Sequence, residues 1–150
     1  APPFIVIDRD LKETAYKDLG RNPKLISVTP SLDTPVCDGQ ARRFNIEAAK
    51  LPAEFQIINI SMDLPFAINR FCAAAGIDRI KTFSDYRHAS FGMAYGVLIK
   101  ELRLLTRAIF VIDSHDIVRY KEVVPEMTNN ANYHAALEAA RQLVETRARG

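Results

Sequence analysis

The chain of 150 residues is 48% hydrophobic and 25% charged, which is the composition of a globular protein and not of a disordered or low-complexity one. Its formal net charge of +2 gives no reason to expect a nucleic acid or a membrane surface as a partner, and its apolar runs are too short to cross a bilayer. Two cysteines, Cys37 and Cys72, are too few for a disulfide framework and lack zinc-ligand spacing, so these values predict one domain over residues 1–150 of a cytoplasmic protein.

The first predicted elements are a strand and the helix that follows it. Lys24–Val28 is a short β-rich run that stops at Pro30. Thr34 and Pro35 then suit a helix N-cap and the first helical position, which places Cys37 in the first turn. Apolar residues recur at spacings of 4, 3, 4 and 3 and predict one buried helical face: Cys37, Ala41, Phe44, Ala48 and Leu51.

A second strand and helix carry the other cysteine. Phe55–Ile60 is typical of an interior strand, and a helix is predicted from Asp63-Leu64-Pro65 to Gly76. Cys72 flanks the predicted inward face of this helix, which consists of Leu64, Ile68, Phe71 and Ala75.

The remaining elements complete an α/β pattern. They are a strand at Ile80–Phe83, a short helix at Ala89–Tyr95, a hairpin of Arg107–Asp113 with Ile117–Val124, and a last helix from about Asn132 to Thr146 with Tyr133, Ala136, Leu137, Ala140 and Val144 facing inward. Strands alternating with helices, then a hairpin and a helix, favour a mixed central sheet flanked by helices. The thioredoxin-like arrangement fits this order.

The position of Cys37 favours a reactive thiolate. Unpaired N–H groups and the positive end of the helix dipole stabilise a thiolate in a first turn. Asp33 and Asp38 oppose this, because neighbouring negative charges disfavour another one, so a cation must come from elsewhere. The alternative is that Cys37 is a small hydrophobe on a buried face.

Cys72 alone is also compatible with a purely structural role. As a pair, two cysteines at helix edges in an intracellular-type chain suggest a transient disulfide. Their Cα atoms must then come within about 7 Å. Since both lie at or beside inward faces, we expect bonding to require local unwinding of at least one helix.

Other chemistries find little support. The three histidines, His88, His115 and His134, have no metal-ligand spacing, and no phosphate loop or dinucleotide fingerprint is present, so no metal or cofactor is expected. Cys37 and Arg43 do have the Cys-x5-Arg spacing of cysteine phosphatases. The residues between them contain an acid and have a helical pattern, which disfavours the curled backbone that such a loop needs.

The motif Pro30-x-x-x-Thr34-x-x-Cys37 resembles the peroxiredoxin active-site motif. Together with Ser61-Met62-Asp63-Leu64-Pro65-Phe66-Ala67 running into Arg70-Phe71-Cys72, and with Arg107-Ala108-Ile109-Phe110-Val111-Ile112-Asp113, it resembles the atypical two-cysteine thiol peroxidases over nearly the whole chain. The resemblance implies a thioredoxin-like fold, hydrogen peroxide and organic hydroperoxides as substrates, thioredoxin as the reductant, and a homodimer.

The resemblance also assigns roles to five residues. Cys37 would be the peroxidatic cysteine, Cys72 the resolving one, Thr34 a peroxide ligand, Pro30 a shield of the sulfur, and Arg107 the cation that Cys37 needs. Relatives usually carry a further N-terminal β-hairpin before the segment that matches Phe4 to Ile7, so we expect this hairpin to be missing here. The functional alternative is a non-catalytic thioredoxin-like module that senses redox state and binds a partner.

Overall fold

The computed structural model describes residues 1–31, 35–48, 50–51, 55–77, 80–124 and 133–149. It describes the side chains of the same residues except 35–38, 133–134 and 144–149. The predicted N-cap Thr34 therefore lies outside the described residues, and Cys37 is described by its backbone alone.

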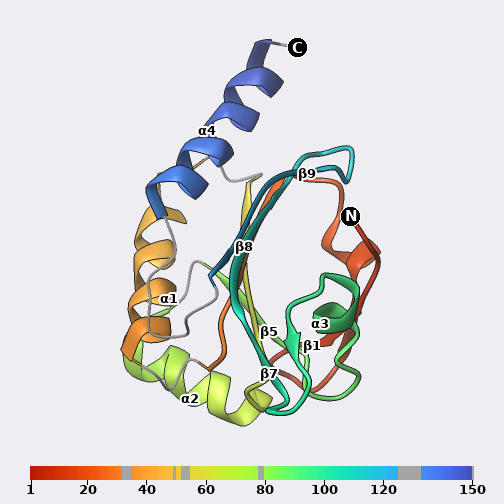
Figure 1. Cartoon of the computed structure of the whole chain (residues 1–150). Coiled ribbons are helices and arrows are strands. Elements are labelled where there is room, and N and C mark those ends of the chain that lie inside the picture. The colour runs from red at the N-terminus through yellow and green to blue at the C-terminus, as the bar shows by residue number, and fades with distance from the viewer. Residues whose placement is uncertain (32–34, 49, 52–54, 78–79, 125–132, 150) are drawn as a thin grey trace.

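A mixed seven-stranded sheet forms the centre of the fold (Figure 1). From one edge to the other its strands are β2 (Glu13–Ala15), β1 (Ile5–Ile7), β5 (Lys81–Ser84), β4 (Gln56–Ser61), β3 (Lys24–Val28), β8 (Arg107–Ile112) and β9 (Val118–Val124). The three strands β3, β4 and β5 run parallel, and the other neighbours pair antiparallel. The predicted mixed sheet is thus confirmed, with the predicted strands and hairpin placed to within a residue.

Four short strands were not predicted. They are β1 and β2, which form an antiparallel pair at the N-terminal end of the chain, and β6 (Leu98–Ile99) and β7 (Leu104–Leu105), which form a separate two-stranded sheet. Two or three residues are too few for an alternating pattern to show.

Helices cover both faces of the sheet (Figure 1). The first face carries α1 (Pro35–Ala48), α2 (Pro65–Ala75) and α4 (Tyr133–Arg149), which share one apolar core with the sheet. The second face carries α3 (Ser90–Ala94) and the 3-10 turn η1 (Tyr16–Leu19). None of the described helices is long and apolar enough to cross a membrane.

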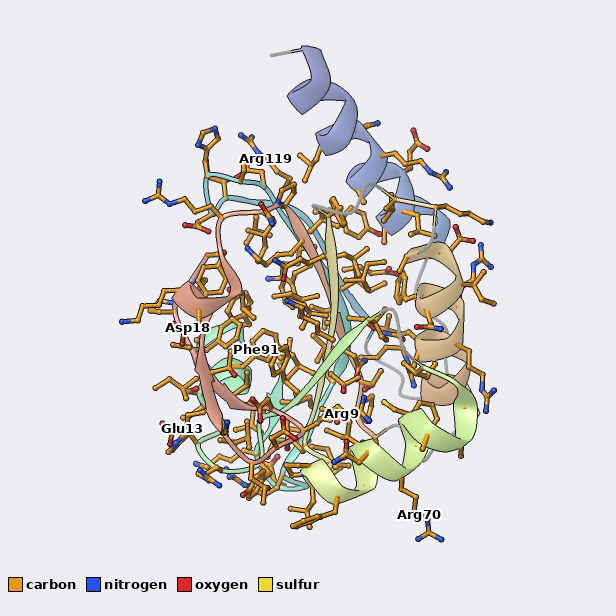
Figure 2. The ribbon with its side chains drawn as sticks, turned by 180° about the vertical axis from the view of Figure 1, so that it is seen from behind. Arg9, Glu13, Asp18, Arg70, Phe91 and Arg119 are labelled. Carbon is orange, nitrogen blue, oxygen red and sulfur yellow. The ribbon has the colours of Figure 1, made fainter. Side chains whose placement is uncertain are left out.

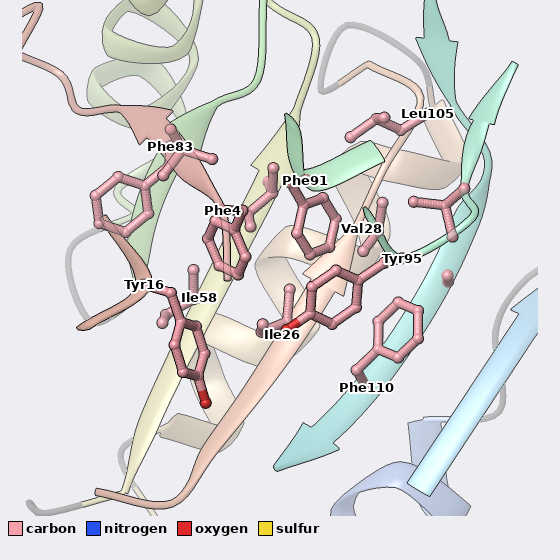
Figure 3. Packing of buried hydrophobic residues seen from close by; sticks show 14 of the residues in the cluster. Phe4, Tyr16, Ile26, Val28, Ile58, Phe83, Phe91, Tyr95, Leu105 and Phe110 are labelled. Carbon is pink, nitrogen blue, oxygen red and sulfur yellow. The ribbon is translucent and has the colours of Figure 1, made fainter. Parts of the chain in front are cut away.

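The core on the second face contains a cluster of aromatic rings among aliphatic side chains (Figure 3). The ring of Phe91 stacks on that of Tyr95 with centroids 4.6 Å apart, and Phe4 packs edge-on against both at 5.0 and 5.6 Å. Phe4 directly precedes β1, so these contacts pack the N-terminal strand pair against α3.

The predicted inward faces of the helices are largely confirmed, with one error on α2. Ala41 and Phe44 of α1 are buried, as are Ala136, Leu137 and Ala140 of α4. On α2, however, Leu64 is 51% exposed, whereas Ile68 and Cys72 are buried. Leu64 is the N-cap, with extended backbone at φ −66° and ψ 148°, so it does not follow the helical periodicity from which its burial was inferred.

Candidate active site

Three central strands bring predicted site residues to one end of the sheet. β3 and β4 are parallel and have their carboxyl ends there, whereas β8 is antiparallel to β3 and begins there. The register pairs Val28 with Ala108, so Arg107 starts β8 just where the chain leaves β3 toward Pro30. Pro30 is itself buried. The topology therefore brings Arg107, from a distant part of the sequence, next to the segment that runs from Pro30 to the start of α1.

Cys37 lies in the first turn of α1, which begins at Pro35 as predicted. A proline suits this position because its missing N–H has no partner within the helix. The free N–H groups of a first turn and the positive end of the dipole favour an anion. A thiolate at Cys37 would therefore be stabilised by the helix that carries it.

Arg107 is buried and bound to the same helix. Its side chain is 1% exposed, and Nη1 donates to Oε1 of Gln40 at 2.9 Å. Gln40 follows Cys37 by three residues, and residues at this spacing are neighbours on a helix surface. Because a guanidinium stays protonated in proteins, Arg107 places a permanent positive charge beneath the first turns of α1.

A buried polar network fixes the orientation of Gln40. Its Nε2 donates to Ser27 Oγ at 2.6 Å and more weakly to the carbonyl of Val28 at 3.5 Å. Asn59 of β4 donates to the Ser27 carbonyl at 3.1 Å. Arg107 can only donate, so Gln40 must turn its oxygen toward Arg107 and its nitrogen toward the strand. The network thereby joins β4, β3, α1 and β8, and it holds the guanidinium in place.

Gln40 was not singled out from the sequence, although a signal was present. It stands directly before Ala41 and four residues before Phe44, both of which belong to the predicted buried face of the helix. A polar side chain at such a position must be hydrogen-bonded if it is buried. A buried glutamine on an apolar helix face is therefore a recognisable candidate for a positioning residue.

Cys72 lies on the buried face of α2. It is 3% exposed and belongs to the same apolar core as Ala41 and Phe44 of α1. Its thiol donates to Thr82 Oγ1 at 3.9 Å, a weak bond to β5. Burial raises the pKa of the Cys72 thiol, although the bond to Thr82 and the charge of Arg9 act in the opposite direction. In the wound helix Cys72 is therefore a protonated, poorly accessible thiol.

Asp63 connects the loops that follow β3, β4 and β5. Its carboxylate accepts from Ser31 Oγ at 2.7 Å and from Ser61 Oγ at 3.0 Å, and its carbonyl accepts from Ser84 Oγ. Asp63 was identified in the sequence only as part of the start of α2. Its contacts now give it the role of holding the loop after Pro30 against that helix.

A cavity of about 770 Å³ adjoins these loops. Apart from the polar residues Ser31, Asp63 and Arg70, its lining consists of apolar residues of α2 and its N-cap, namely Leu64, Phe66, Ala67, Phe71 and Ala74. Phe66 and Leu64 are exposed large apolar residues of this wall, at 67% and 51%. Because Ser31 directly follows Pro30, the cavity offers an apolar surface beside the predicted active-site loop.

The phosphatase alternative is contradicted by the path of the chain. Residues 35–48 form one continuous α-helix, so the backbone between Cys37 and Arg43 is not curled around an anion site. Arg43 is exposed and pairs with Glu47 at 3.3 Å on the solvent side of α1.

Among the described residues, no group of three His, Cys, Asp or Glu side chains has the geometry of a metal site. His88 lies on the surface with Nε2 3.1 Å from Glu13 Oε1, and His115 lies in the turn between β8 and β9. The side chain of His134 lies outside the described part of the chain.

The chain is similar to known proteins over almost its whole length. The Redoxin family model matches residues 1–137. A thiol peroxidase of Bacillus subtilis is 52% identical over 145 residues, covering 97% of this chain and 86% of the relative, and a thiol peroxidase of Halalkalibacterium halodurans is 52% identical over 141 residues, covering 94% and 84%.

Solved structures give the same picture. A peroxiredoxin-like protein from Aquifex aeolicus superposes with a TM-score of 0.88 at 36% identity, covering 95% of this chain and 84% of that one. A thiol peroxidase from Chromobacterium violaceum superposes with a TM-score of 0.84 at 24% identity, covering 98% and 86%, which supports the fold alone. The predicted thioredoxin-like fold is confirmed, and the chain belongs to the Redoxin family and, within it, to the thiol peroxidases.

Proposed function

We propose that this chain, as a thiol-dependent peroxidase, reduces hydroperoxides through Cys37 and returns to its thiol form through a disulfide with Cys72. The strongest support is the position of Arg107, a buried cation that Gln40 anchors to the helix whose first turn carries Cys37. This is the cation that the sequence requires, because Asp33 and Asp38 disfavour a thiolate.

The first chemical step is nucleophilic attack on the peroxide. The Cys37 thiolate attacks one peroxide oxygen, the O–O bond breaks, and the departing alkoxide or hydroxide takes up a proton, leaving a sulfenic acid on Cys37. Arg107 stabilises the thiolate and the charge that develops on the leaving oxygen. We assign peroxide binding to Thr34 and the shielding of the sulfur from water to Pro30, which is buried beside Ser31.

The second step regenerates the enzyme. The Cys72 thiolate attacks the sulfenic sulfur, an S–S bond forms, and hydroxide leaves and is protonated to water. We propose that thioredoxin then reduces this disulfide and is itself oxidised to a disulfide. Because recycling needs a reducing compartment, we place the enzyme in the cytoplasm, as one domain over residues 1–150 that assembles as a homodimer.

We assign organic hydroperoxides to the cavity beside Ser31. Its apolar wall on α2 offers a surface for an alkyl or aryl group when the peroxide oxygens are at Cys37. Phe66→Ser should raise KM for cumene hydroperoxide about tenfold and leave KM for hydrogen peroxide unchanged. An equal change in KM for both substrates would show that the cavity does not bind the organic group.

The decisive experiment couples peroxide consumption to reduced thioredoxin and its reductase. Wild-type protein should turn over, Cys37→Ser should be inactive, and Cys72→Ser should consume one equivalent of peroxide and then stop. Absence of peroxide consumption by the wild type would favour the redox-sensing module instead. Sedimentation equilibrium of the same protein tests the homodimer, which a monomer at micromolar concentration would exclude.

A further inference from the structure

A polar contact between the β1–β2 turn and α2 lies outside the catalytic steps described above. Arg9 Nε donates to Asn69 Oδ1, and Asn69 Nδ2 donates to the carbonyl of Arg9 at 3.0 Å. One amide side chain on the helix therefore contacts both the side chain and the backbone of a residue sixty positions earlier. Figure 2 shows Arg9 next to α2.

The turn that carries Arg9 is itself well fixed. Asp8 accepts from the N–H of Asp10 at 2.8 Å and from that of Lys12 at 3.0 Å through Oδ1, and its own N–H donates to the Lys12 carbonyl at 2.9 Å. The strand that leads into the turn, β1, pairs with β5 at Ile7 and Ser84. Arg9 is thus held to the sheet, and Asn69 is held to Arg9.

The contact lies one turn from the resolving cysteine. Asn69 and Cys72 are three residues apart on α2 and are neighbours on its surface. Because Cys72 is buried in the core, we expect α2 to unwind when Cys72 bonds to Cys37. Unwinding this turn moves Asn69 away from Arg9, so both hydrogen bonds must break before Cys72 is free.

We propose that Arg9 and Asn69 form a clasp that keeps α2 wound and thereby sets the rate at which Cys72 resolves the sulfenic acid. The clasp rests on the proposed function in one respect, which is that Cys72 is the resolving cysteine. Arg9 and Asn69 are positioning residues, since they act through the helix and not on the peroxide.

The clasp also determines how readily the enzyme is over-oxidised. A sulfenic acid that waits for Cys72 can attack a second peroxide, forming another S–O bond and breaking the O–O bond, to give a sulfinic acid and water or an alcohol. Resolution and over-oxidation compete for the same intermediate. A slower release of Cys72 therefore makes the enzyme more sensitive to high peroxide concentrations.

The test follows both oxidation products by rapid quenching and mass spectrometry. Arg9→Ala should leave the rate of sulfenic acid formation unchanged, accelerate disulfide formation about threefold to tenfold, and raise by the same factor the peroxide concentration that over-oxidises half of the protein. Lys12→Ala removes an exposed charge of the same sign from the same turn and should change neither rate. Unchanged disulfide formation in Arg9→Ala would overturn the proposal.

A double-mutant cycle separates the clasp from other effects. Asn69→Ala removes both hydrogen bonds of the clasp, whereas Arg9→Ala removes only the one from Nε. Because alanine also favours helix, Asn69→Ala strengthens α2 at the same time, so its two effects act in opposite directions. In the double variant, the further acceleration caused by Arg9→Ala should disappear, because its partner is already gone. Fully additive effects would contradict the clasp.

Hydrogen exchange keeps the clasp testable apart from the peroxidase chemistry. In the reduced protein, Arg9→Ala should speed exchange of the α2 amides about threefold to tenfold and leave those of α1 unchanged. If the wild type forms no disulfide between Cys37 and Cys72 but this exchange difference is present, the proposed function and the control of resolution fail, and the clasp stands only as the contact that keeps α2 wound. If exchange is unchanged, the clasp fails whatever the chemistry.

Discussion

Gln40→Glu is a nearly isosteric change at the residue that anchors Arg107. The carboxylate can still accept from Nη1, which now donates at 2.9 Å, and Ser27 can turn its hydroxyl to donate to the other oxygen. Packing is therefore retained while a negative charge is added beneath the first turns of α1. We expect the variant to fold and to have a less acidic thiol at Cys37.

The size of this effect follows from the helix geometry. A side chain three residues from Cys37 is about 6 Å away. With an effective dielectric constant of about 20, the repulsion between carboxylate and thiolate is about 3 kcal/mol, or about 2 pKa units. For a thiol that is mostly ionised at neutral pH, a rise of this size lowers the thiolate fraction, and with it the rate with peroxide, about tenfold.

The assay is the pH dependence of Cys37 alkylation by iodoacetamide, measured in the Cys72→Ser background so that one thiol reacts. Ile46→Glu adds the same charge at an exposed position of α1, about 14 Å further along the axis, and should not shift the pKa. An unchanged pKa in Gln40→Glu would refute the electrostatic reasoning. An equal rise in Gln40→Met, which adds no charge, would assign the effect to the lost hydrogen bonds instead.

Three further predictions concern stability, each measured by urea denaturation. Gly92→Ala should cost about 1–3 kcal/mol, because its Cβ would lie 2.7 Å from Leu105 Cδ2; a neutral result would show that β7 yields easily. Phe91→Ala should cost about 3–5 kcal/mol, since the fully buried ring contacts three other aromatic rings, and a loss under 1 kcal/mol would contradict this. Burial opposes ionisation of Asp113, but backbone N–H groups and the Arg119 guanidinium outweigh burial and lower the pKa of this carboxyl below 3.8. The Asp113 carboxylate therefore stabilises the fold at neutral pH, and this contribution is lost as the pH falls through the pKa of the folded state. Asp113→Asn should therefore lose less stability than the wild type between pH 4 and pH 2, and parallel losses would refute this sign.

The sequence predicts the parts of the fold that depend on local pattern. The strand Lys24–Val28, the start of α1 at Pro35 and the end of α2 at Gly76 were all placed correctly, because each depends on residues close together in the chain. Leu64 was misplaced for a local reason as well, since periodicity does not extend to an N-cap with extended backbone.

The parts of the site that depend on strand register could not be predicted from the residues alone. Arg107 was expected near Cys37 only because of the family resemblance. Its place follows from β8 running antiparallel to β3, with Ala108 opposite Val28. Nothing in a one-dimensional pattern sets that pairing, which is decided by the contacts of the whole sheet. The Gln40 hydrogen bond follows from it and was missed for the same reason.

The burial of Cys72 links the geometry of resolution to its chemistry. Within the wound helix, burial makes the Cys72 thiol inaccessible and also raises its pKa, and both effects make it a poor nucleophile. Unwinding α2 removes both obstacles together, because the movement that brings the sulfur toward Cys37 also exposes it to water and returns its pKa toward the ordinary value. Resolution should therefore depend on the unwinding equilibrium of α2 and not on a second activating base. Across variants, we expect the rate of disulfide formation to follow the hydrogen-exchange rate of the α2 amides.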